Sequence, residues 1–171
     1  MCDFSGSMEG LPLYNSMGLG MFLAHQNQGV FKNVLIEFES QPKFIKLKGN
    51  FIDDFNILKT HDAIGTTNID LVFKKIILSM KNNNNFSDNP KYILIISDME
   101  FNQATSNNQD SNFEHWKNEF KSYNLELPKI IFWNVDFDID QSFPVVKNEK
   151  NVVLISGFST HILKDLFNIE S

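Results

Sequence analysis

The sequence contains no arginine, one cysteine and no long uninterrupted apolar run. Arginine binds phosphates and base edges in bidentate fashion, so its absence from a chain of net charge −6 disfavours direct nucleic-acid binding. The single cysteine, Cys2, can form neither an intrachain disulfide nor a cysteine-based zinc site. No apolar segment has the length of a membrane span, and the start lacks the pattern of a signal peptide. We therefore expect a protein of a reducing compartment, the cytoplasm, without membrane association.

Apolar residues, by contrast, are abundant. They make up 42% of the 171 residues, and 17 of them are phenylalanine. This composition can build a sizeable core, and the length suits one domain of ordinary size. We therefore expect a single domain over residues 1–171.

Hydrophobic periodicity predicts strands and helices that alternate along the chain. Gly18 and Gly20, inside the first predicted helix, indicate close packing against a sheet. The pattern predicts an α/β fold: an open, mainly parallel central sheet with helices on both faces and one antiparallel hairpin at its edge. The predicted helices cover residues 11–28, 51–59, 69–81, 113–123 and a last segment ending near 168; the predicted strands cover 34–38, 43–48, 91–97, 129–135 and 152–155.

Three segments offer hard oxygen ligands near predicted strand ends. The opening residues place one carboxylate and two hydroxyls at alternate positions, a loop at 65–68 reads Gly-Thr-Thr-Asn, and an aspartate follows the strand at 91–97. The carboxyl ends of parallel strands meet at one edge of a sheet, and Mg²⁺ and Mn²⁺ prefer oxygen ligands. The candidate metal ligands are Asp3, Ser5, Ser7, Thr67 and Asp98.

The opening string D-x-S-x-S is by itself equally compatible with a polar turn that caps the following helix. Gly6 and Gly10 would permit the tight backbone path that brings the alternate side chains together. The order of the segments favours the metal interpretation. The string adjoins a helix, a hairpin follows, and then come the Gly-Thr-Thr-Asn loop and an apolar strand that ends in aspartate.

In this order the motifs resemble a von Willebrand factor A (VWA) domain with a metal-ion-dependent adhesion site. The matching positions are Asp3, Ser5 and Ser7 for the first motif, Thr67 for the second and Asp98 for the third. The resemblance implies a bound divalent cation, usually Mg²⁺, with one open coordination position that a carboxylate of a partner protein fills. It implies binding rather than catalysis, and no general base or nucleophile is evident beside the motifs.

The segments SDMEF, KIIFWNV and LISGFSTHILK are similar to those of a family found in giant viruses, plants and fungi. In that family the C-terminal half is a VWA domain related to that of the Ro ribonucleoprotein autoantigen, and a long helical region precedes it. In a VWA domain the first motif follows a central strand, whereas only Met1 and Cys2 precede Asp3 here. We expect the missing part of that strand to come from preceding sequence or a partner chain, or to be absent.

Two alternatives from other functional classes stay open. A Mg²⁺-dependent hydrolase or phosphotransferase could use Asp3 and Asp98, but such enzymes need a second carboxylate as general acid where this chain has Ser5. A ribonucleoprotein-associated module, acting through a partner, would follow from the likeness to the Ro relative, and the acidic composition weakens direct contact with RNA.

The remaining polar and aromatic residues have simpler interpretations. The four histidines lack metal-ligand spacing and are predicted to be surface or capping residues, and the acidic loop with Asp136, Asp138 and Asp140 is predicted to be solvated rather than a calcium site. Asn68 and Glu100 could support the metal ligands from outside. The residues predicted to belong to the core are Cys2, Trp116 and Trp133.

Overall fold

The computed structural model describes residues 1–37, 39–61, 69–98, 109–135 and 152–156. Its helices are α1 (Leu11–Gln26), α2 (Phe51–Leu58), α3 (Ile69–Asn82) and α4 (Gln109–Ser122), and short 3-10 turns are η1 (Gly6–Met8), η2 (Gly29–Phe31) and η3 (Phe86–Asp88). Its strands are β1 (Val34–Glu37), β2 (Lys43–Lys46), β3 (Tyr92–Ser97), β4 (Lys129–Asn134) and β5 (Val152–Ser156). The predicted last helix and the acidic loop at 136–140 lie outside the described residues.

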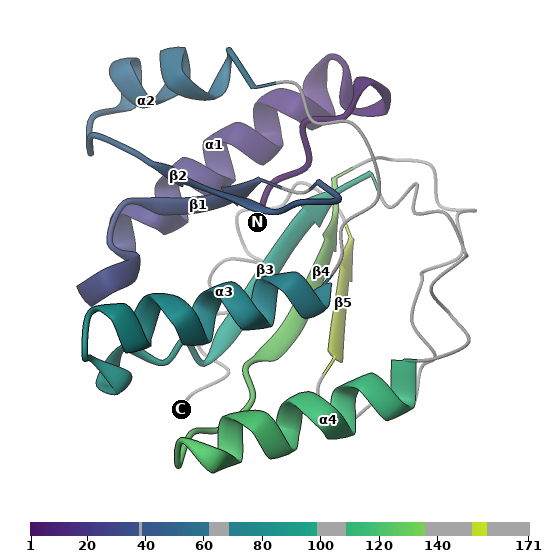
Figure 1. The fold of residues 1–171 in the computed structure, drawn as a ribbon. Helices are drawn as coiled ribbons and strands as arrows, with labels where there is room; N and C mark the ends of the chain where they lie inside the picture. The colour runs from purple at the N-terminus through teal and green to yellow at the C-terminus, as the bar shows by residue number, and fades with distance from the viewer. Residues whose placement is uncertain (38, 62–68, 99–108, 136–151, 157–171) are drawn as a thin grey trace, which may run out of the picture.

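Strands β3, β4 and β5 form a parallel sheet in that order, and β1 and β2 form an antiparallel hairpin. Figure 1 shows α1 and α2 on one side of the strands and α3 and α4 on the other. The predicted fold class, a mainly parallel α/β sheet covered on both faces, is therefore confirmed. None of the described helices has the length and apolar character needed to cross a membrane.

The first residues of the chain join the hairpin to the parallel strands. Cys2 forms parallel bridges to Glu37 of β1 on one side and to Ile96 of β3 on the other. The Cys2 amide donates to the carbonyl of Ile36, and the Ile96 amide donates to the carbonyl of Met1, each at 3.0 Å. The strand order across the molecule is thus β2, β1, the opening residues, β3, β4 and β5.

The chain's amino group is enclosed in the same place. The Met1 ammonium donates to the carbonyl oxygen of Leu94 at 2.5 Å. Burial lowers the pKa of this amino group below its usual range, because the low-dielectric surroundings disfavour its charged form. Enclosing an ammonium in a sheet therefore costs stability at neutral pH.

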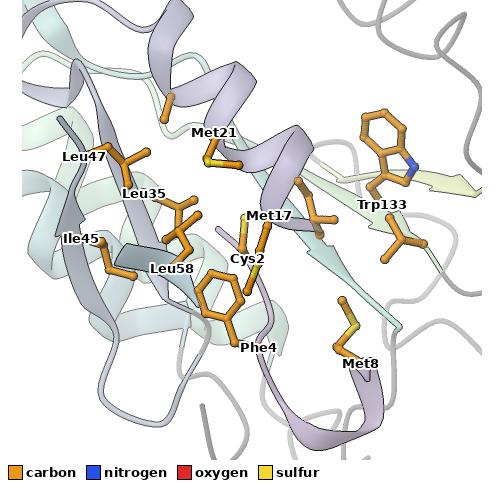
Figure 2. Close-up of a cluster of buried hydrophobic side chains, with 13 residues drawn as sticks. Cys2, Phe4, Met8, Met17, Met21, Leu35, Ile45, Leu47, Leu58 and Trp133 are labelled. Carbon is orange, nitrogen blue, oxygen red and sulfur yellow. The ribbon is translucent and has the colours of Figure 1, made fainter. Parts of the chain in front are cut away.

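Side-chain alternation along the strands divides the core in two. One cluster lies between the sheet and α1 and α2, and Figure 2 shows Cys2 and Met17 near its middle, with Met8 and Trp133 toward one edge. The other cluster lies between the sheet and α3 and α4 and includes Phe73, Ile95 and Phe132. Trp133 belongs to the first cluster and Trp116 to the second, so the three residues predicted to be core are confirmed as buried.

The two glycines of α1 differ in their surroundings. A Cβ on Gly20 would lie 2.3 Å from the Cys2 sulfur and 2.8 Å from a methyl carbon of Leu35. Gly20 thus lets the helix backbone approach the sheet, as the sequence predicted. A Cβ on Gly18 would meet nothing within 4 Å, so the same prediction for Gly18 is wrong.

Several element boundaries differ from the predicted ones by a few residues. Strand β2 ends at Lys46 instead of residue 48, because the amides of Lys48 and Gly49 donate to the carboxylate of Asp54 at 2.6 and 3.0 Å. Helix α1 ends at residue 26, where Asn27 takes an extended conformation, and α4 begins at residue 109 instead of 113. Hydrophobic periodicity does not predict hydrogen bonds between side chains and the backbone, such as those of Asp54 at the end of β2.

Candidate functional site

The candidate site begins where the opening strand residues turn away from the sheet. The Asp3 amide donates to the carbonyl of Ile96 in β3 at 3.0 Å, which fixes the Asp3 backbone at the carboxyl end of the sheet. The Asp3 side chain then accepts the amide of Ser5 at 2.9 Å through Oδ1. This short loop of hydrogen bonds holds the carboxylate over the end of β3 and turns the chain toward η1.

The buried hydroxyl of Ser97 connects the two candidate carboxylates. Its Oγ donates to Asp3 Oδ2 at 2.7 Å and lies 3.4 Å from Asp98 Oδ1. Ser97 and Asp98 come at the end of β3, next to the strand position of Asp3, and all three side chains are buried. The Asp98 amide points to the sulfur of Met8 at 3.1 Å, which ties the end of β3 to η1.

The two serines of the opening string lie beside each other at the solvent side of this loop. Ser5 Oγ and Ser7 Oγ are 3.1 Å apart, and Ser7 is exposed. Gly10 adopts φ +95° directly before α1, so it supplies the backbone freedom that the sequence predicted. Gly6 has no such conformation and lies inside η1, so the same expectation for Gly6 is wrong.

Burial dominates the electrostatics of Asp3. It raises the pKa of the Asp3 carboxyl above its usual range, and charge on Asp98 raises it further. The hydrogen bonds from Ser5 and Ser97 act in the opposite direction, because they stabilise the ionised form. In the described part of the chain no lysine or histidine pairs with Asp3. Burial and the charge on Asp98 thus both disfavour the ionised form of Asp3.

The donor set suits a hard divalent cation, which prefers carboxylate, hydroxyl and water oxygens. The fold brings four of the five predicted ligands to one end of the sheet: Asp3, Ser5, Ser7 and Asp98. The fifth, Thr67, lies outside the described residues, as do Asn68 and Glu100. Within the described ranges no three His, Cys, Asp or Glu side chains gather in a metal-binding group. A cation here would thus depend on two carboxylates, on hydroxyls and on water.

Residues 1–171 match the family described as "Domain of unknown function (DUF7788)". The chain belongs to this family. The "Uncharacterized protein L728" of Acanthamoeba polyphaga mimivirus is 31% identical to it over 173 residues, a match that covers 98% of this chain. The same match covers 30% of the viral protein, so the DUF7788 chain spans under a third of that relative's length.

Among solved structures, this DUF7788 chain is similar to one titled "Crystal Structure of the SpRpn10 VWA domain". The TM-score is 0.51 with 14% sequence identity, over 98% of this chain and 91% of that chain. At this identity the likeness shows the fold alone. The DUF7788 chain therefore has a VWA-like fold, in agreement with the fold that the motifs implied.

Two histidines of the DUF7788 chain pair with buried carboxylates away from the candidate site. His25 Nε2 lies 2.7 Å from Asp54 Oδ2 and links α1 to α2. His61 Nδ1 lies 3.1 Å from Glu37 Oε2 at the end of β1. Both histidines are partly buried and hydrogen-bond to carboxylates, where the sequence predicted surface or capping roles. Asp54 and Glu37 themselves were not singled out by sequence.

Ser97 is a residue of the site that the sequence motifs do not include. Its position offered a usable signal. It is a polar residue that ends an otherwise apolar strand and directly precedes Asp98. Once Asp3 is placed beside β3, that position faces its carboxylate. A serine that ends an apolar strand directly before an aspartate can therefore indicate a side chain that positions a carboxylate on the neighbouring strand.

Proposed function

We propose that this DUF7788 chain is a protein-binding module that depends on a divalent cation, Mg²⁺ or Mn²⁺. The proposed ligands among the described residues are Asp3, Ser5, Ser7 and Asp98, and Thr67 is the proposed ligand outside them. The observation that carries the proposal is the arrangement of Asp3 and Asp98 around the Ser97 hydroxyl, beside the Ser5–Ser7 pair. The VWA-like fold is consistent with it.

The chemistry of this ligand set favours a further acidic ligand. Two carboxylates balance the charge of one divalent cation, and neutral hydroxyls leave it electrophilic enough to accept another carboxylate. The exposed side of the site, where Ser7 lies, gives a partner access. We propose that an aspartate or glutamate of a partner protein fills the open coordination position.

We propose further that the module is not an enzyme. A phosphoryl-transfer site built on Asp3 and Asp98 would need a general acid at position 5, and the Ser5 hydroxyl is too weak an acid for that role. Metal-dependent hydrolysis of p-nitrophenyl phosphate by the wild type, lost in Asp3→Asn, would contradict this part of the proposal.

Calorimetric titration with MgCl₂ and MnCl₂ tests the metal site. Wild type should bind one cation, and Asp3→Asn and Asp98→Asn should each weaken binding by about tenfold or more, since even residues outside the ligand shell have effects of this size. Glu9→Gln is the matched control, because Glu9 is an exposed carboxylate just after the same loop. If both Asn variants fold and keep wild-type affinity, the proposal is wrong.

A further inference from the structure

A groove of about 410 Å³ lies between α3 and α4, on the side of the sheet opposite to α1 and α2 in Figure 1. We call it the α3–α4 groove. Its apolar lining comes from Ile77 and Leu78 of α3, from Trp116 of α4 and from Tyr123, which follows α4. Ile77 and Trp116 are buried, whereas Leu78 is 43% exposed. The groove therefore has an apolar base that both helices form, and it opens to solvent along Leu78.

The packing of the two helices fixes this base. The Phe73 ring of α3 lies 5.6 Å from the Trp116 ring, centroid to centroid, and the Trp116 indole N–H donates to Asp70 at 2.6 Å. The Tyr123 ring stacks on the Phe86 ring at 5.4 Å. Because its N–H is already bonded, Trp116 offers the groove an apolar surface. The groove is thus preformed, which lowers the entropic cost of binding a ligand there.

Charged side chains line the same groove on both helices. Lys74 and Lys81 belong to α3, and Glu119 belongs to α4, as does His115. Both lysines are exposed, and within the described part of the chain neither forms an ion pair. Two such lysines beside an apolar base, in a chain of net charge −6, favour a ligand that is itself acidic and partly apolar.

The spacing of the two lysines indicates the shape of the ligand. Lys74, Leu78 and Lys81 occupy positions i, i+4 and i+7 of α3, so they follow one side of the helix over about 10 Å. A second helix that lies along the groove can reach both lysines with acidic residues seven positions apart. It then places an apolar side chain between them, over Leu78. Docking of an amphipathic helix into an apolar groove is a recurring mode of peptide recognition.

A second copy of this chain does not offer a helix of that kind. Among the described helices, α1 contains no acidic residue, and α2, α3 and α4 contain no two acidic residues seven positions apart. The charges of the groove therefore match a helix of another protein better than they match a helix of this chain.

We infer that the α3–α4 groove binds an amphipathic helix of a partner protein. Acidic residues at i and i+7 of that helix face Lys74 and Lys81, and an apolar residue between them packs against Leu78 and Trp116. A basic residue on the other side of the helix faces Glu119. The inference does not rest on the proposed metal site, because the groove is formed by α3 and α4 and all of its charges belong to the chain itself.

The test uses a phage-displayed library of amphipathic helical peptides whose polar positions vary among Glu, Lys and Gln. Selection on the full chain in EDTA buffer keeps the proposed metal site out of the experiment. The selected peptides should carry Glu at two positions seven apart, with an aliphatic or aromatic residue between them. Their affinity should fall about tenfold or more for Lys74→Glu/Lys81→Glu, because both pairs of opposite charges become pairs of like charges.

Two controls accompany this variant. Lys32→Glu/Lys59→Glu changes the net charge by the same amount at exposed lysines that do not line the groove, and it should bind as wild type does. A selected peptide in which Lys replaces both Glu residues should bind the Lys74→Glu/Lys81→Glu variant better than it binds wild type. This rescue would also show that the variant is folded.

The remaining outcomes overturn the inference. They are a selection that yields no binder, peptides without the acidic spacing, and binding that Lys74→Glu/Lys81→Glu leaves unchanged. Sedimentation of the chain alone gives a further check. A dimer that the same variant dissociates would show that a second copy occupies the groove, which also contradicts the inference.

Discussion

Replacing Ser97 by alanine should destabilise the protein, because its hydroxyl donates to the buried carboxylate of Asp3 at 2.7 Å. A hydrogen bond to a charged group contributes roughly 1.5–3 kcal/mol, and its loss leaves that carboxylate more costly to ionise. For a domain of this size, a loss of about 2 kcal/mol lowers Tm by about 4–8 °C. Differential scanning calorimetry in metal-free buffer measures this change.

Ser16 provides a matched control for this experiment. Its side chain is also fully buried, but its hydroxyl interacts with the Cys2 sulfur instead of a carboxylate. Ser16→Ala should therefore change the stability less than Ser97→Ala, because it removes no bond to a charged group. Equal Tm values for Ser97→Ala and Ser16→Ala would refute the role assigned to Ser97.

Four further changes probe the fold. Gly20→Ala should lower the free energy of unfolding by about 1–3 kcal/mol, because the added methyl group overpacks the core. Gly18→Ala should raise it by up to about 1 kcal/mol, and urea unfolding measures both changes. Asp54→Ala should lower the free energy of unfolding by about 3 kcal/mol in the same assay, since it leaves two backbone amides and a histidine without their partner. An unchanged free energy would contradict the structural role of Asp54. A strand-forming extension fused before Met1 should raise Tm, because a peptide group then replaces the buried ammonium. An unchanged Tm would contradict the destabilising effect assigned to that ammonium.

Most of the fold could be predicted from the sequence because its signals are local. Apolar runs such as that of β3 and the helical spacing of α3 are typical of covered strands and amphipathic helices, and both elements occur nearly where expected. The contacts that close the fold are not local. The contact between His25 of α1 and Asp54 of α2 and the place of Cys2 between β1 and β3 join distant segments that no periodicity connects.

The candidate site was predictable to a similar extent. Motif order pointed to five residues: Asp3, Ser5, Ser7, Thr67 and Asp98. Thr67 lies outside the described residues, and the other four lie near one another at one end of the sheet. Ser97 was missed because its role appears only when β3 lies beside the opening residues. The exposure of Leu11 and Tyr14 on α1 was not predicted, because hydrophobic spacing does not distinguish a buried helix face from an exposed one. The bound cation and the relationship to the Ro relative stay predictions.

The most direct test of the central claim is Mn²⁺ line broadening in ¹⁵N-labelled protein. A paramagnetic ion broadens the amide signals nearest to it. Substoichiometric Mn²⁺ should therefore selectively broaden the signals of Asp3, Ser5, Ser7 and Asp98, and excess Mg²⁺ should restore them. Broadening centred on other acidic residues, or weak broadening spread evenly over the chain, would contradict a metal site at this end of the sheet.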